Sequence, residues 1–310
     1  MLGGPLRIAG FVLAGLVVVA FGIRFAFGRM LDTGGTPAGA LQKTAASKDG
    51  TVIAYEQTGA GPVIILVSAA LVDREGARPL ARQLAPAFTV INYDRRGRGK
   101  STNVGPYVVE REIEDLDALA SVVAGPVMLF GSSSGAVLAL DGANRLGSKV
   151  SKVFLYEPPF IVDDSRPPMP ETLLQDVTAA LSANRRDEAV SLFFSKGMGI
   201  PGVGVGFMRL LMPAWKDMTR LAHTAPYDLM ILSGTQLGKP LPTERWNATT
   251  APVRVAVGSK SEPFFHSGAK ALTSVVNAQY MSLDGLDHSA MLMAPEKLAA
   301  AIRTFAVPGK

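Results

Sequence analysis

The chain has 310 residues, of which 48% are hydrophobic and 18% charged, so it can bury one large core. Its formal net charge of +5 is a mild basic excess, and the densest basic stretch, residues 95–100, contains no aromatic residue, so we do not expect nucleic-acid binding. The absence of cysteine excludes disulfides, thiolate chemistry and cysteine-based zinc sites.

An apolar stretch lies near the N-terminus, at residues 8–27, and Arg24 is its one charged residue. Its length is about what is needed to cross a hydrocarbon core of roughly 30 Å. We therefore expect a single-pass membrane anchor within residues 1–30. The alternative is a cleaved signal peptide and a secreted protein, but the nearest small-residue cleavage pattern, at residues 38–40, lies far beyond the apolar run. Basic residues flank both ends, so the side of the membrane stays open.

After residue 46, short apolar runs typical of buried strands alternate with segments of helical spacing. This alternation predicts an α/β fold with a parallel sheet flanked by helices. It stops at Glu157 and resumes at residues 253–257, and the region between contains helix-like runs and bulky apolar side chains. We expect that region to be a helical lid over the carboxyl ends of the strands. The expected parts are the anchor at 1–30, a linker at 31–46, the core at 47–160 and 252–310, and the lid at 161–251.

The most informative motif follows an apolar run at residues 127–130, where Gly131, Ser133 and Gly135 fit the G-x-S-x-G pattern of a nucleophile elbow. A strand that reverses sharply into a helix strains the residue at the turn, and only small residues two positions before and after it let the backbones pass. The serine hydroxyl then stands at the positive end of the helix dipole. A glycine- and serine-rich turn in an ordinary strand-to-helix connection fits the same pattern, so the context has to decide.

The order and spacing of three features resemble the α/β-hydrolase fold superfamily over residues 47–307. They are the elbow, the loop Asp94-x-Arg96-Gly97-x-Gly99-x-Ser101 after the preceding strand, and His288 in a loop between the last strand and the last helix. Within the superfamily, the chain is similar to the small lidded serine esterase and peroxidase-like group, in which the elbow helix leads to a segment such as Tyr156-Glu157-Pro158-Pro159. The resemblance implies an α/β-hydrolase fold with a mostly parallel, eight-stranded-type sheet, flanking helices and a helical lid.

The resemblance also implies that Ser133 is the nucleophile and His288 its base. Serine is a weak nucleophile at its free pKa and needs an adjacent base that is neutral near pH 7, which histidine supplies. Of the three histidines, His288 is the one that follows a strand where the family carries its base. We expect His266, at a helix start, to be structural, and His223, in the lid, to be structural or to line the pocket.

The acid that orients the histidine has two candidates. The family commonly places an aspartate three residues beyond a glycine after the penultimate strand, but here Ser261 stands at that position and Glu262 follows one residue late. The superfamily also uses the end of the strand after the elbow helix, where this chain has Glu157. A carboxylate at a buried strand end needs a partner. We therefore prefer Glu157 and keep Glu262 as the alternative.

By the same resemblance, the backbone N–H groups of Ala70 and Ser134 form the oxyanion hole. Family members usually carry His-Gly after the third strand, whereas residues 67–71 of this chain read Val-Ser-Ala-Ala-Leu. Because the donors are backbone groups, the path of the backbone matters more than the identity of the side chain. The loss of one such donor costs about 3–4 kcal/mol of transition-state stabilisation.

The expected function is hydrolysis of a carboxylic ester or lactone through an acyl-enzyme, with a small apolar acyl substrate and neither a cofactor nor a metal. Acyl transfer, perhydrolysis and carbon–carbon bond hydrolysis use the same elbow, so they stay open, as does the oligomeric state. The alternative is a catalytically weak or inactive hydrolase-like protein that binds or senses a ligand, which the missing His-Gly pair and the displaced acid favour. A plain scaffold is the third hypothesis.

Overall fold

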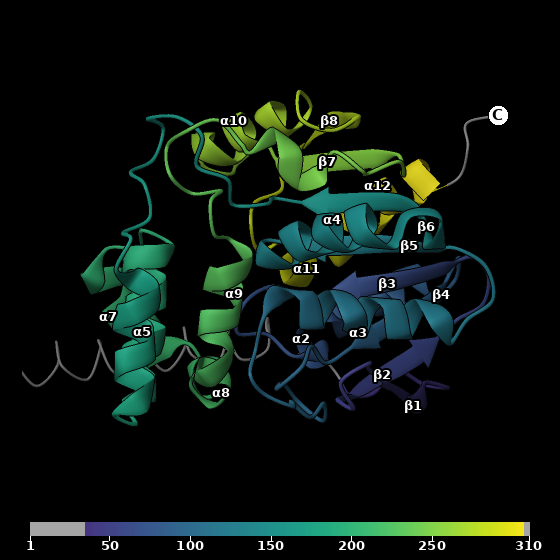
Figure 1. The fold of residues 1–310 in the computed structure, drawn as a ribbon, viewed down its shortest axis with the longest axis horizontal. Helices are drawn as coiled ribbons and strands as arrows, with labels where there is room; N and C mark the ends of the chain where they lie inside the picture. The colour runs from purple at the N-terminus through teal and green to yellow at the C-terminus, as the bar shows by residue number, and fades with distance from the viewer. Residues whose placement is uncertain (1–34, 307–310) are drawn as a thin grey trace, which may run out of the picture.

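An eight-stranded sheet forms the centre of the structure, a computed structural model that describes residues 35–306. Helices cover both faces of the sheet, and a further group of helices stands beside it, on the left of Figure 1. The strands are β1 (Leu41–Ala46), β2 (Val52–Thr58), β3 (Val63–Val67), β4 (Thr89–Tyr93), β5 (Val127–Ser132), β6 (Val150–Tyr156), β7 (Val253–Gly258) and β8 (Ala278–Leu283).

The strand order is β1-β2-β4-β3-β5-β6-β7-β8. The strand β2 pairs antiparallel with β1 and with β4, and all the other neighbours are parallel. The carboxyl ends of the parallel strands therefore share one edge of the sheet, where ligands bind in open α/β folds. This arrangement confirms the expected α/β-hydrolase fold with its mostly parallel sheet.

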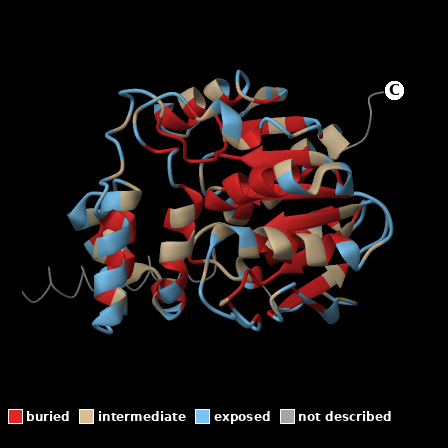
Figure 2. Cartoon of the chain, viewed as in Figure 1, coloured by how far each residue is buried: buried red, intermediate tan, exposed pale blue. Residues whose placement is uncertain are grey.

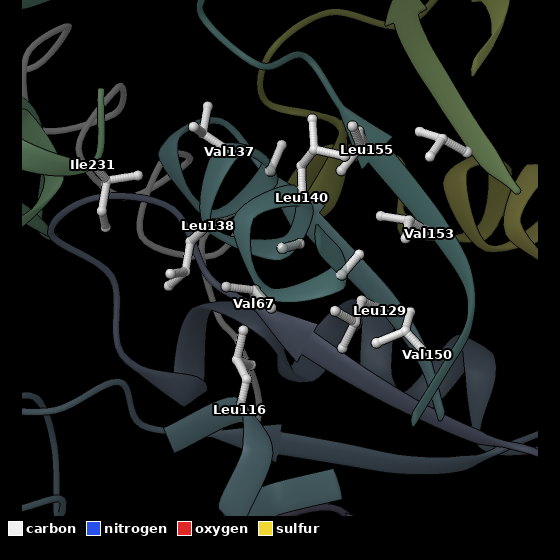
Figure 3. Packing of buried hydrophobic residues seen from close by; sticks show 14 of the residues in the cluster. Val67, Leu116, Leu129, Val137, Leu138, Leu140, Val150, Val153, Leu155 and Ile231 are labelled. Atoms are coloured by element: carbon white, nitrogen blue, oxygen red, sulfur yellow. The ribbon is translucent and has the colours of Figure 1, made fainter. Parts of the chain in front are cut away.

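Successive side chains of the central strands alternate between two cores. In β3, Ile65 and Val67 belong to the core that includes residues of α3, α4 and α10, whereas Ile64 and Leu66 belong to the core that includes residues of α2, α11 and α12. Buried residues follow the central strands in Figure 2, and Figure 3 shows Leu116 of α3 in the first core with Val67. The flanking helices are α2 (Arg74–Leu84), α3 (Val109–Ser121), α4 (Ser134–Leu146), α10 (Pro263–Leu272), α11 (Ala290–Met293) and α12 (Pro295–Ala306).

Local sequence explains where these helices begin and which face they bury. Asp73 caps α2, because its side chain accepts a hydrogen bond of 3.0 Å from the backbone N–H of Glu75. In α3, Leu116 and Leu119 are buried, and Ile113 packs against the same core. Their spacing of three residues places them on one face of the helix.

Between β6 and β7 the chain forms a group of helices with its own small core. Aromatic and aliphatic side chains fill this core, including Phe194 and Trp215 with ring centroids 5.9 Å apart, and Leu71 from the loop after β3 joins them. The helices are α5 (Leu173–Ser182), α6 (Arg186–Leu192), α7 (Gly202–Leu211), α8 (Trp215–Leu221) and α9 (Ala225–Ile231). A π-helical turn follows α6 at Phe193–Gly197, and short 3-10 turns lie at Gly147–Lys149, Ala222–Thr224 and Thr243–Trp246.

The expectation of an N-terminal transmembrane helix, and of the membrane localisation inferred from it, needs correction. Within residues 35–306, none of the helices has the length and apolar character needed to cross a bilayer. The apolar stretch at residues 8–27, on which that expectation was based, lies outside the described residues. Over residues 35–306, the structure therefore shows the α/β-hydrolase fold alone.

The expected linker at residues 31–46 is wrong in its last part, because Leu41–Ala46 form the edge strand β1. Most of its side chains are exposed, so the strand buries little apolar surface and shows no hydrophobic alternation. Backbone pairing with β2 holds it instead, in a register that places Leu41 opposite Gln57. Side-chain hydrogen bonds across the pair, from Gln42 to Glu56 and from Lys43 to Gln57, add to this pairing.

Buried charges tie the group of helices between β6 and β7 to the rest of the molecule. Asp228 of α9 has no exposed surface and accepts hydrogen bonds of 2.6 Å from both Arg95 and Arg98, in the loop after β4. Arg95 also donates two hydrogen bonds of 2.7 Å to Glu112 of α3. Burial by itself raises the pKa of Asp228, but the two guanidinium groups hold that pKa below its ordinary value, so Asp228 is ionised.

We expect the substitution Asp228→Asn to lower the free energy of unfolding by about 3–5 kcal/mol, because it leaves two buried guanidinium groups without their shared counterion. The exposed ion pair of Arg185 with Glu188 provides the control, and Glu188→Gln should cost about 1 kcal/mol or less. Urea unfolding of the three proteins measures the difference. Equal, small losses in both variants would contradict the structural role of Asp228.

Candidate active site

The turn at Ser133 has the geometry that the motif predicts. Its backbone angles, φ 55° and ψ −127°, place a non-glycine residue in a strained region between the end of β5 and the start of α4. A Cβ atom on Gly131 would lie 2.3 Å from the carbonyl oxygen of Gly135, and one on Gly135 would lie 2.4 Å from the carbonyl oxygen of Val67. Only glycine fits at either position, so the strand, the helix and the end of β3 pass at backbone contact around Ser133.

His288 follows β8 and pairs with Glu157 at the end of β6. The distance from His288 Nδ1 to Glu157 Oε2 is 2.7 Å, and Glu157 has no exposed surface. The other carboxylate oxygen, Oε1, accepts hydrogen bonds from the backbone N–H of Gly258 at 2.7 Å and from the hydroxyl of Ser261 at 2.5 Å. With the Nδ1 proton directed at this carboxylate, Nε2 of the imidazole is the nitrogen left to accept a proton.

The structure separates the two candidate acids. Glu262 lies at the surface as the residue before α10, and its carboxylate makes no hydrogen bond or ion pair with His288 in the described part of the chain. Ser261, which stands where the family commonly has its aspartate, donates to Glu157. The residue at the position of the usual aspartate therefore contacts the carboxylate of Glu157 but does not itself supply a carboxylate.

The loop after β3 is held by the two arginines that bind Asp228. Arg95 donates to the carbonyl oxygen of Ser68 at 3.2 Å, and Arg98 donates to those of Ala69 at 2.6 Å and Val72 at 3.0 Å. These contacts fix the carbonyl groups on either side of Ala70. Within residues 35–306, the N–H of Ala70 donates to no protein acceptor.

Ser134 lies next to this loop as the first residue of α4. Its N–H is one of the amides at a helix start that the hydrogen bonds of the helix leave unused. Its hydroxyl donates to Asp228 at 2.7 Å, so the side chain is turned to the buried carboxylate. The backbone donors expected at Ala70 and Ser134 therefore both stay available.

A cavity of about 160 Å³ brings these residues together. Ser133, Ser134, Ala70 and His288 all line it, and Phe265 stacks on the His288 ring at 4.8 Å between centroids. Apolar side chains from the region between β6 and β7 form much of the remaining wall, among them Phe193, Phe194, Met198, Met218 and Leu229. The cavity is therefore small and mainly apolar, with the serine and the histidine in its wall.

The other two histidines lie away from this cavity. His223 is exposed, and its Nε2 contacts the carbonyl oxygen of Gly97 at 2.8 Å. The Nδ1 of His266 contacts the hydroxyl of Tyr280 at 2.8 Å. Neither histidine lines the cavity, and each contacts a neighbouring part of the fold. This agrees with the expectation that His266 is structural and with the first of the two expectations for His223.

Two features near the site could not be predicted from the sequence. Arg95 and Arg98 belong to a loop that we recognised as typical of the family, but their partner Asp228 lies about 130 residues further on and has no motif of its own. Arg166 and Gln236, which also line the cavity, carry no local signal either. Contacts between residues so far apart in the sequence emerge only from the folded chain.

A model of the alpha/beta hydrolase family matches residues 45–301 of the chain. A solved alpha/beta hydrolase from Sphaerobacter thermophilus is 40% identical, with a TM-score of 0.78 over 86% of this chain and 100% of that one. The hydrolase YraK of Bacillus subtilis, described as uncharacterized, is 33% identical over 149 residues, which are 46% of this chain and 54% of that protein. A bifunctional esterase/perhydrolase of Acinetobacter calcoaceticus is 27% identical over 66% of this chain and 76% of that protein. The chain belongs to the alpha/beta hydrolase family.

The close approach at the elbow predicts that Gly135→Ala is strongly destabilising, because the new methyl group meets the backbone of the chain after β3. Gly206 in α7 is the matched control, since a Cβ atom there meets nothing within 4 Å. We expect Gly206→Ala to raise the free energy of unfolding by about 0.5–1 kcal/mol. Thermal unfolding of both variants tests this, and a neutral Gly135→Ala would contradict the geometry of the elbow.

Proposed function

We propose that this member of the alpha/beta hydrolase family is a serine hydrolase that cleaves a carboxylic ester or lactone through an acyl-enzyme. The observation that carries the proposal is that His288, which lines the same cavity as Ser133, pairs with the fully buried Glu157 behind it. A nucleophile, a base and an orienting acid are the three parts that this chemistry requires.

In the proposed reaction, His288 Nε2 removes the proton of the Ser133 hydroxyl as the serine oxygen attacks the carbonyl carbon of the substrate. Glu157 holds the imidazole in the required tautomer and stabilises the imidazolium. The N–H groups of Ala70 and Ser134 donate to the developing oxyanion. When the tetrahedral intermediate collapses, the bond to the leaving oxygen breaks and His288 gives its proton to that oxygen. Water then attacks the acyl-enzyme by the same steps, which releases the acid and restores Ser133.

The cavity supports a small acyl group. Its volume of about 160 Å³ is similar to that of an engineered apolar cavity of roughly 150 Å³ that holds benzene, a molecule of about six non-hydrogen atoms. The esterase/perhydrolase of Acinetobacter calcoaceticus, as its name describes it, carries out chemistry of the proposed class.

We expect Ser133 to react with a fluorophosphonate probe and the protein to hydrolyse 4-nitrophenyl butyrate. Ser133→Ala should abolish both, and His288→Ala should abolish turnover. Glu157→Gln should lower kcat by about 10³- to 10⁴-fold, because the histidine loses the group that fixes its tautomer.

Glu262→Gln is the matched control for Glu157→Gln, because it removes an acid from the neighbouring loop at the surface. We expect it to change kcat less than about twofold, as for surface substitutions in general. Mass spectrometry of the labelled protein and steady-state kinetics are the measurements. A folded protein that neither labels at Ser133 nor turns over esters would favour the ligand-binding alternative.

A further inference from the structure

One cation lies in the wall of the otherwise mainly apolar cavity. Arg166, in the segment between β6 and α5, is half-buried and lines the cavity together with Ser133 and His288. Its guanidinium lies 4.5 Å from the centroid of the Phe264 ring, and one NH2 group donates to the carbonyl oxygen of Gly197 at 3.0 Å. The ring and the backbone therefore hold the guanidinium in place.

The carboxylate of Glu262, at the surface, acts on the charge of Arg166 from a distance, but the guanidinium has no directly paired counterion within the described residues. It forms no ion pair there, and one hydrogen bond uses one of its five N–H donors. The other two arginines near the site, Arg95 and Arg98, have their charges balanced by Asp228 and Glu112. A partly desolvated cation is costly without an anion, so the charge of Arg166 is not explained by the stability of the fold.

A second polar side chain in the cavity wall also keeps unused hydrogen-bonding capacity. Gln236 is 3% exposed; its Nε2 donates to the carbonyl oxygen of Pro159 at 2.8 Å, and its Oε1 has no partner in the described part of the chain. Buried polar atoms are nearly always satisfied by protein, water or a ligand. The cavity therefore suits a compound with both apolar and polar parts.

We propose that Arg166 binds a carboxylate on the acyl part of the substrate. The preferred substrates are then half-esters or related monoacyl derivatives of short dicarboxylic acids, in which one carbonyl reacts at Ser133 and the other end is an anion. A carboxylate matches the planar fork of a guanidinium with two parallel hydrogen bonds. This inference rests on the proposed function and assigns the substrate class of the same site.

The protonation state of the Arg166 guanidinium agrees with a role in binding an anion. Burial lowers the pKa of Arg166, and the carboxylate of Glu262 acts in the opposite direction. A guanidinium stays protonated in proteins at all ordinary pH values. The binding of the anion should therefore not depend on the titration of Arg166 near neutral pH.

The test compares two methyl esters of the same shape on the full-length protein, monomethyl succinate and methyl 4-methylpentanoate. The carboxylate of the first is replaced in the second by an isopropyl group. We expect Arg166→Met to lower kcat/KM for monomethyl succinate by about 10- to 100-fold and to change kcat/KM for the neutral ester less than about threefold. Methionine keeps an unbranched apolar side chain beside Phe264, and pH-stat titration measures both rates.

Two controls separate substrate recognition from a structural role. Arg185→Met removes an exposed arginine of the same lid and should leave both rates within about twofold of wild type. Arg166→Lys keeps the charge but not the planar fork, and should retain part of the preference for the anionic ester. Equal losses for both esters in Arg166→Met, or no loss for monomethyl succinate, would overturn the inference.

A binding measurement decides the inference even without turnover. Calorimetry with monomethyl succinate compares Ser133→Ala with the double variant Ser133→Ala, Arg166→Met, and we expect binding at least about tenfold weaker in the second. Equal binding, or none to either protein, would refute the role of Arg166 and leave the hydrolase proposal to the probe experiment. Binding that depends on Arg166 in a protein that does not react with the probe would instead support the carboxylate site and refute the hydrolase proposal.

Discussion

The contact of three backbone segments around Ser133 is the constraint on which the site depends. The end of β5, the start of α4 and the end of β3 approach so closely that no Cβ atom fits at Gly131 or Gly135. This contact exposes the serine, and it also places the loop that carries Ala70 beside the first amide of α4. The positions of Ser133 and of the N–H groups of Ala70 and Ser134 are therefore set by one packing arrangement, and a change that loosens it alters all of them together.

The position of Glu157, the acid of the proposed mechanism, follows from the sheet. The strands β6 and β7 are parallel neighbours, with Tyr156 paired with Ala256, so the residues just beyond their carboxyl ends lie side by side. Glu157 at the end of β6 and Ser261 in the loop after β7 meet there, and the backbone N–H of Gly258 completes the contact. Side chains from the ends of both strands therefore meet at the carboxylate that pairs with His288.

The features that the sequence predicted are those with a local cause. The elbow depends on glycines within two residues of Ser133, and the sheet depends on apolar runs that repeat along the chain. Both signals are therefore visible in the sequence. The same motifs point to Ser133 and His288, which the structure places in the wall of one cavity. The edge strand β1 was missed because backbone pairing, not apolar burial, holds it in place. Asp228 and Arg166 were missed because their importance comes from contacts with residues far away in the sequence.

The arginines near the cavity differ in whether an acidic side chain is paired with them, and this difference suits them to different roles. Arg95 and Arg98 are neutralised by Asp228 and Glu112, so they fix the carbonyl groups beside Ala70 without adding a net charge to the site. A fixed loop without excess charge suits an oxyanion hole, whose donors have to be positioned before charge develops. The charge of Arg166, which has no directly paired counterion in the described part of the chain, lies in the wall of the same cavity, where in the proposed role it selects an anion on the substrate. Within the proposed function, positioning and selection thus belong to different arginines, and one can be changed without the other.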